Sequence, residues 1–121
     1  MNLRKLYHSF GYALQGIRTV ILTEQNFRIH TLAAIVVFIA GIFTSLSKME
    51  WILVIILVFG MFVIELVNTA IERVVDLVTP NFHPLAKQAK DLAAGACLIY
   101  AVCTVIVGLI IFLPKWLELL F

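Results

Sequence analysis

Charged residues, proline and glycine are all scarce in this sequence. Asp, Glu, Lys and Arg make up 13% of the 121 residues, about half of the share that is usual in a soluble domain. With 3 prolines and 6 glycines, the chain is neither collagen-like nor a low-complexity segment. Hydrophobic residues make up 63%. This composition excludes an ordinary soluble domain and indicates an integral membrane protein.

Cysteine and histidine are too few and too scattered for a zinc site or a disulfide framework. The two cysteines, Cys97 and Cys103, lie six positions apart in a segment that we expect to be helical. Their side chains would point about 240° apart around the helix axis, so they cannot be bridged within it. We interpret both as buried thiols.

Several signatures of other functions are missing as well. The net charge is only +2, and no basic patch is present, which argues against nucleic acid as a partner. The phosphate-binding loop, the dinucleotide-binding glycine motif and the His-Arg-Asp catalytic loop of common soluble kinases do not occur. Arg18, Glu24 and Arg28 interrupt the start of the chain, so we expect no cleaved signal peptide.

Three long apolar runs dominate what is present. They predict transmembrane helices at 28–47, 49–78 and 85–114, within a single membrane-embedded domain covering 1–121. Two prolines separate the second run from the third, which is typical of a loop. We expect Pro114 to end the last helix. The predicted fold class is therefore an all-α integral membrane protein.

Residues 1–26 show helical spacing but are too polar to cross a membrane. They predict an amphipathic helix lying in the interface, with its apolar side toward the acyl chains. The apolar positions are Leu6, Phe10, Leu14, Ile17 and Ile21, and the polar ones are Arg4, Lys5, His8, Gln15 and Arg18.

The distribution of Lys and Arg predicts the orientation of the chain. Lys48 and Lys115 lie at one membrane boundary, and all other basic residues lie at the opposite one. Because cytoplasmic loops carry the excess of basic residues, we expect the second boundary to be the cytoplasmic side of a multi-pass membrane protein.

An acidic stripe, Glu65, Asn68, Glu72 and Asp76, follows the second apolar run on one face of its helix. Carboxylates are costly near hydrocarbon, so an acid there indicates function. Carboxylate and amide oxygens suit Mg²⁺, which shares its coordination shell with substrate phosphates. The hypothesis is phosphoryl transfer from cytosolic ATP to a lipid alcohol, with Glu65 as the catalytic base.

Two further segments are expected to meet the acidic stripe at the cytoplasmic boundary. Glu24 would hold Mg²⁺ together with Glu72, while Arg28 and Lys90 would contact the polyphosphate. An alternative for Glu24 and Arg28 is an ordinary ion pair within one helix, since they are four positions apart.

A small cation carrier or channel subunit is the alternative from another class, with the same acids coordinating a translocated ion. Such a path requires polar groups through the depth of the bilayer. Residues 52–64 and 98–113 offer only Tyr100, Cys103 and Thr104, which counts against this alternative.

Three motifs together are similar to the prokaryotic diacylglycerol kinase family, most closely to its undecaprenol kinase branch in Gram-positive bacteria. They are Glu-Gln-Asn-Phe-Arg at 24–28, Glu-Leu-Val-Asn-Thr-Ala-Ile-Glu-Arg-Val-Val-Asp at 65–76, and Ala-Lys-Gln-Ala-Lys-Asp-Leu-Ala-Ala-Gly-Ala at 86–96. The diacylglycerol branch often has a serine where Ala94 stands, so the resemblance favours undecaprenol as the acceptor, with diacylglycerol as the alternative.

The resemblance implies a homotrimer that uses Mg-ATP and builds its active sites between subunits. It also implies a role for individual residues: Glu65 as the catalytic base, Glu24 and Glu72 as metal ligands, Asn68, Lys90 and Asp91 as further site residues, and Asp76 and Arg28 on the nucleotide side.

Two further expectations concern lipid-facing surfaces. The small residues at 93–96 permit close approach of a second helix, which favours self-association. Bulky apolar residues of the surface helix and the inner end of the second span would line the path of the lipid, namely Phe10, Leu14, Ile17 and Ile64.

Overall fold

The computed structural model describes all 121 residues and contains four helices and no strand. The helices are α1 (Leu3–Thr23), α2 (Gln25–Thr44), α3 (Lys48–Val78) and α4 (Pro84–Leu120). Three of them, α2, α3 and α4, are long and apolar enough to cross a membrane. The predicted all-α membrane fold with three spanning helices is confirmed at this level.

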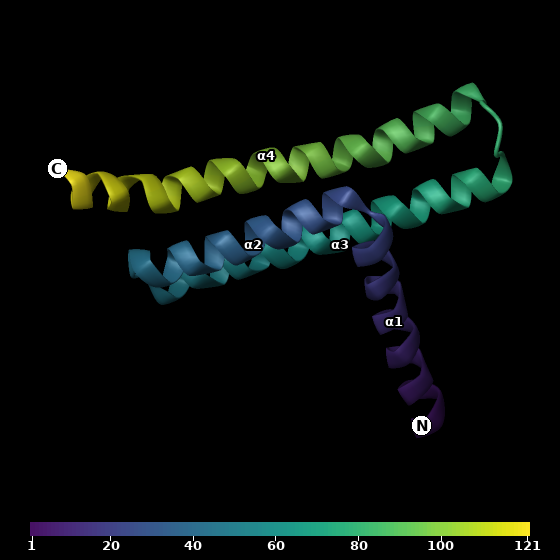
Figure 1. The fold of residues 1–121 in the computed structure, drawn as a ribbon, viewed down its shortest axis with the longest axis horizontal. Helices are drawn as coiled ribbons and strands as arrows, with labels where there is room; N and C mark the ends of the chain where they lie inside the picture. The colour runs from purple at the N-terminus through teal and green to yellow at the C-terminus, as the bar shows by residue number, and fades with distance from the viewer.

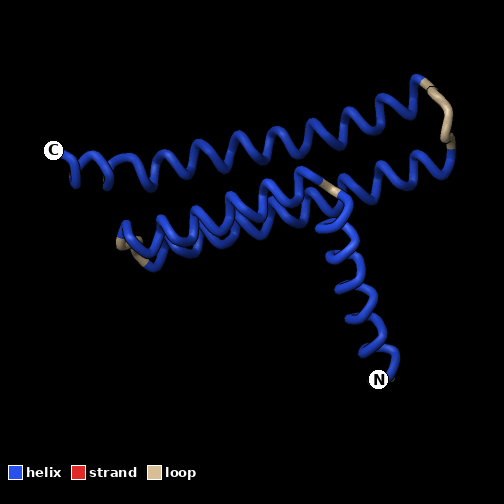
Figure 2. The backbone as a smooth tube through the Cα atoms, viewed as in Figure 1, coloured by secondary structure: helices blue, strands red, loops and turns tan.

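The three long helices lie side by side, and α1 leaves them crosswise (Figure 1). α4 packs mainly on α3, and α2 lies against α3. Beyond the corner between α1 and α2, α3 and α4 continue as a pair that is closed by a short loop, drawn in tan in Figure 2. We call the end of the bundle that carries the α3–α4 loop the inner end, and the end that carries the α2–α3 loop the outer end. The inner end is a two-helix extension, and α1 projects beside its base.

Side chains and local backbone geometry define the helix ends. Asn2 Oδ1 accepts a hydrogen bond from Lys5 N, and Ser47 Oγ accepts one from Glu50 N, which are typical N-caps. Glu24 has extended backbone torsions, φ −108° and ψ 114°. This single residue breaks the helix, so the interfacial segment predicted at 1–26 ends at Thr23 and the next helix begins two residues later.

The prediction that Pro114 ends the last helix is wrong, because α4 runs through it to Leu120. Proline removes one backbone donor and usually kinks or breaks a helix. Here two contacts hold the following turn against the neighbouring helices. Lys115 Nζ lies 3.3 Å from Glu50 Oε2, and Trp116 Nε1 donates to Thr44 Oγ1 at 2.9 Å.

The buried core is thin. Only 14 of the 121 residues are buried, and the main cluster, in the outer half, consists of Ala34, Val54, Val58, Ile111 and Phe112. Most large apolar side chains are exposed on the single chain. In a membrane such side chains meet lipid or a partner helix, so their exposure is expected for spanning helices.

Candidate active site

The acidic stripe runs from the buried part of α3 to its exposed inner end. Glu65 is buried, with 6% of its surface exposed. Asn68 and Glu72 are half-buried, and Asp76 is exposed. The stripe therefore connects a secluded carboxylate to the exposed end of α3 through a graded series of oxygen-bearing side chains.

Glu65 meets a histidine from the neighbouring span. His30 Nε2 of α2 lies 3.2 Å from Glu65 Oε1, and 28% of the histidine side chain is exposed. Such a partner lowers the cost of placing a carboxylate among apolar residues. Sequence reasoning did not include His30 in the site. The available signal was an ionisable residue inside a predicted span, which by default points to function.

Asn68 and Glu72 form the middle of the acidic stripe. Asn68 Nδ2 donates to Glu72 Oε1 at 3.4 Å. Asn68 Oδ1 is buried and has no hydrogen-bond partner within the chain. A buried amide oxygen without a partner carries a cost unless a further ligand satisfies it. This oxygen and the neighbouring carboxylate are donors of the kind that Mg²⁺ prefers.

Glu24 is held at the corner between α1 and α2 by a residue of α3. Arg73 Nη2 lies 3.6 Å from Glu24 Oε1 and donates to Thr23 Oγ1 at 3.0 Å. Sequence reasoning used Arg73 only to orient the chain. This ion pair holds Glu24 against α3 at the residue that follows Glu72, but no group of three His, Cys, Asp or Glu side chains gathers as a metal site in the single chain.

Arg28 of α2 binds backbone carbonyl groups at the end of α1. Its Nη1 donates to the carbonyl oxygens of Ile21 and Leu22, at 3.3 and 3.2 Å, and the alternative pair with Glu24 does not form. Carbonyls in the last turn of a helix lack intrahelical donors. Arg28 therefore caps the end of α1 and fixes the corner beside the site.

The remaining predicted residues lie on the two-helix extension. Lys90 Nζ of α4 pairs with Asp76 Oδ1 of α3, which joins the two helices directly. Asp91 points to a different partner, because it pairs with Lys87 on its own helix and is exposed. The structure thus brings Lys90 to the exposed end of the acidic stripe, but Asp91 does not contact the stripe.

An apolar groove of about 390 Å³ runs between α2, α3 and α4. His30 lines the groove, and so does Trp116 near the opposite end of the bundle. Because His30 also touches Glu65, the groove reaches the neighbourhood of the buried carboxylate. Its walls are mostly aliphatic, with Ala33, Val58 and Leu109 from the three helices.

The lining predicted for the lipid path does not come together in the single chain. Phe10, Leu14 and Ile17 are exposed on α1, whereas Ile64 is half-buried on α3. The physical reason is the extended residue Glu24, which turns α1 away from the bundle so that only the end of α1 touches α2 and α3.

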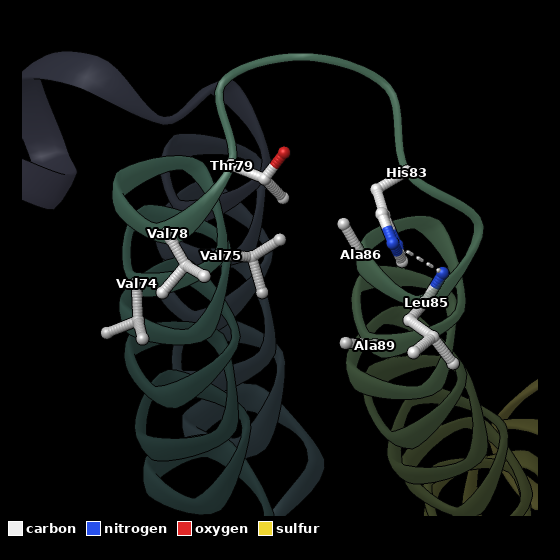
Figure 3. Close-up of a pocket in the computed structure, with 8 residues that line it drawn as sticks. All are labelled: Val74, Val75, Val78, Thr79, His83, Leu85, Ala86 and Ala89. Carbon is white, nitrogen blue, oxygen red and sulfur yellow. Dashed lines mark hydrogen bonds between the residues drawn. The ribbon is translucent and has the colours of Figure 1, made fainter.

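A second cleft, of about 380 Å³, lies between the inner ends of α3 and α4. Figure 3 shows its two walls below the connecting loop: Val75 of α3 points toward Ala86 and Ala89 of α4, and Val74 and Val78 complete the α3 wall. Thr79 and His83 supply its polar groups, and His83 Nδ1 accepts a hydrogen bond from Leu85 N. This cleft belongs to the same two-helix extension as the Asp76–Lys90 pair.

Comparisons with known proteins identify the family of the chain. A family model described as prokaryotic diacylglycerol kinase matches residues 11–112. An undecaprenol kinase from Bacillus subtilis (strain 168) is 50% identical, over 94% of this chain and 93% of the relative. A diacylglycerol kinase from Synechocystis sp. is 45% identical, over 93% of this chain and 65% of that protein.

A more distant relative is the diacylglycerol kinase of Escherichia coli (strain K12), which is 28% identical over 84% of each chain. The family match covers the acidic stripe, the corner at Glu24 and the segment around Lys90. These findings confirm the predicted kinase class and leave no support for the cation carrier. The chain therefore belongs to the prokaryotic diacylglycerol kinase family and is a membrane lipid kinase.

Proposed function

We propose that the protein transfers the γ-phosphate of ATP to undecaprenol at the cytoplasmic face of a bacterial cell membrane. The observation that carries this proposal is a buried carboxylate, Glu65, whose histidine partner opens onto an apolar groove. A polyprenol needs only an apolar path, and the undecaprenol kinase of Bacillus subtilis is 50% identical to this chain. The groove offers no cluster of polar groups that would recognise the esters of a diacylglycerol.

Glu65 acts as the general base in this proposal. It accepts the proton of the lipid hydroxyl while the hydroxyl oxygen bonds to the γ-phosphorus and the bond to the β-phosphate oxygen breaks, releasing ADP. Burial of Glu65 keeps the acceptor site away from bulk water, which would otherwise compete as the nucleophile. Most of the catalysis in phosphoryl transfer comes from positioning and charge neutralisation.

The donors of the acidic stripe fit Mg²⁺. Asn68 Oδ1 is buried without a partner beside Glu72, and we assign these two residues to the metal, with Glu24 as a further acid from the α1–α2 corner. When bound, Mg²⁺ would neutralise phosphate charge. Arg73 competes for Glu24 in the single chain, so Glu24 would have to leave this ion pair to reach the metal.

The nucleotide is assigned to the two-helix extension. Lys90 and Asp76 lie at the exposed end of the acidic stripe, and the apolar cleft between Val75 and Ala89 lies beside them (Figure 3). Lys90 would exchange Asp76 for phosphate oxygens, a charge-assisted contact. Arg28 and Asp91 are assigned to the nucleotide side on the family resemblance. An aliphatic cleft of this size would suit the flat face of a purine.

Self-association and membrane placement complete the proposal. The small residues at 93–96 and the extensive apolar exposure of the spans support self-association, and the family resemblance makes the assembly a homotrimer. α1 projects crosswise with an apolar side that has no partner in the chain, which supports a position in the lipid interface. The basic residues at the inner ends of the helices support a cytoplasmic site.

Thin-layer analysis of labelled lipid tests the acceptor. The purified protein would be incubated with ATP, Mg²⁺ and either undecaprenol or diacylglycerol in the same mixed micelles. We expect a higher kcat/KM for undecaprenol, with measurable product from both lipids, because an apolar groove discriminates only weakly. A tenfold preference for diacylglycerol would reverse the choice of acceptor and leave the kinase class intact.

A further inference from the structure

His30 is a polar residue on the packed face of a spanning helix. The other residues of that face that are buried against neighbouring helices are Phe27, Ala34, Gly41 and Thr44, which are apolar or small. A histidine here loses contact with water, so it requires a polar partner. Glu65 Oε1, at 3.2 Å, is the partner that the structure provides.

The Glu65 carboxylate, in turn, has His30 as its polar partner. No other side chain in the chain forms an ion pair or a hydrogen bond with this carboxylate. Its neighbours on α3 toward the outer end are apolar, including Met61 and Phe62. Because a glutamate side chain has several rotatable bonds, a contact on Oε1 restricts the directions in which the second oxygen, Oε2, can face.

We propose that His30 is the positioning residue for Glu65 in the kinase reaction. The imidazole engages Oε1, so that Oε2 remains free and directed toward the hydroxyl of the lipid acceptor. This inference rests on the proposed role of Glu65 as the base. It adds to the site a residue of α2 at the border between the carboxylate and the apolar groove.

The backbone around His30 is itself held in place, as a positioning role requires. One turn earlier, the ring of Phe27 packs on Phe62 of α3 with centroids 5.1 Å apart. Arg28 binds the last carbonyls of α1. These contacts fix the start of α2 against α3 and against the corner. The imidazole therefore reaches Glu65 from a rigid element and not from a mobile loop.

The test compares three variants of the full-length protein in mixed micelles with undecaprenol. His30→Phe keeps a ring but removes the nitrogen, and we expect kcat to fall about 100-fold, as misplacement of a reacting group by about 1 Å can cause. KM for ATP and for the lipid should change less than twofold. His30→Gln places an amide donor near the former Nε2 and should recover most of kcat.

Thr31→Val is the matched control, because it removes a polar group from the adjacent position of α2. The Thr31 hydroxyl donates only to the carbonyl of Phe27 in its own helix, so kcat should not change. A His30→Phe protein with unchanged kcat, or an equal loss in Thr31→Val, would overturn the positioning role. If His30→Phe fails to insert, His30→Gln should exceed His30→Asn at least tenfold, and equal activity overturns the proposal.

The double variant separates this inference from the proposed function. If His30 acts through Glu65, then His30→Phe adds no further loss to Glu65→Gln, since residues that act as a unit are not additive. If the kcat losses of the two single variants instead multiply in the double variant, His30 acts independently of Glu65. This outcome would contradict the positioning role alone. An active Glu65→Gln enzyme would instead contradict the assignment of Glu65 as the base.

Discussion

The outer and inner ends of the helix bundle use their polar residues in opposite ways. At the outer end, polar groups tie helix to helix: Trp116 Nε1 donates to Thr44 Oγ1, and Lys115 pairs with Glu50. The ring of Trp51 fills the space over Gly41, where an added Cβ would lie 2.7 Å from Trp51 Cη2. Thr44 and Trp116 are hydrogen-bonded within the chain, and Glu50 has an ion-pair partner in Lys115, although its buried Oε2 accepts no hydrogen bond.

At the inner end, polar groups are left incompletely satisfied. Asn68 Oδ1 is buried without a partner, Glu65 has a single contact, and Asp76 and Lys90 meet at the exposed tip. Unsatisfied and charged groups cost stability and are kept where chemistry needs them. We infer that the outer end serves the fold, whereas the inner end serves the proposed reaction.

The largest effect is expected at Glu65, because the contrast between the two ends of the bundle predicts that its substitution lowers activity without lowering stability. Glu65→Gln should lower kcat by about 10³-fold, within the range of general-base contributions. The melting temperature should stay the same or rise, because a costly buried carboxylate is removed. Steady-state kinetics and thermal unfolding in detergent measure the two quantities. An unfolded variant whose folded remnant turns over normally would make Glu65 a structural residue.

A smaller effect is expected at the middle of the acidic stripe. Glu72→Gln removes one anionic ligand next to Asn68 Oδ1, so the Mg²⁺ concentration for half-maximal activity should rise about tenfold or more. Titration of activity with Mg²⁺ at saturating ATP measures the shift. Glu118→Gln at the outer end of α4 is the matched control and should leave the titration unchanged. An unshifted curve for Glu72→Gln would remove this residue from the metal site.

At the outer end, Gly41→Ala should show the reverse of Glu65→Gln, which is a loss of stability with activity kept. The added methyl group would overlap the Trp51 ring, and overpacking of this kind costs about 1–3 kcal/mol of unfolding free energy. Turnover per folded molecule should stay within twofold of the parent. Gly11→Ala, where no atom lies within 4 Å of the added Cβ, provides the control. A large fall in kcat for Gly41→Ala would show that the two ends are coupled.

The smallest effect is expected for Glu50→Gln. It breaks a partly exposed ion pair with Lys115, and such pairs contribute about 0–1 kcal/mol. Unfolding free energy in detergent should fall by no more than this amount, and kcat should not change. A loss of several kcal/mol would mean that this ion pair, and not packing, holds the last turns of α4 beyond Pro114.

Particular residues show where sequence reasoning reached the site and where it stopped. Glu65, Asn68, Glu72 and Asp76 were predicted because helical spacing places them on one face, whatever the neighbours are. Lys90 was predicted from its place just before the third apolar run, but its pairing with Asp76 required the packing of α4 on α3. His30 was missed because it is distant from Glu65 in sequence and stands alone in an apolar run.

The sequence by itself determined the membrane class, the three spans, the acidic stripe and the family motifs, because composition and helical periodicity depend only on the order of residues. Tertiary structure alone decided which side chains meet: His30 with Glu65, Arg73 with Glu24, and Arg28 with the end of α1. It also decided that α4 continues through Pro114. Such contacts join residues across two helices, and they depend on helix register and direction, which local pattern does not specify.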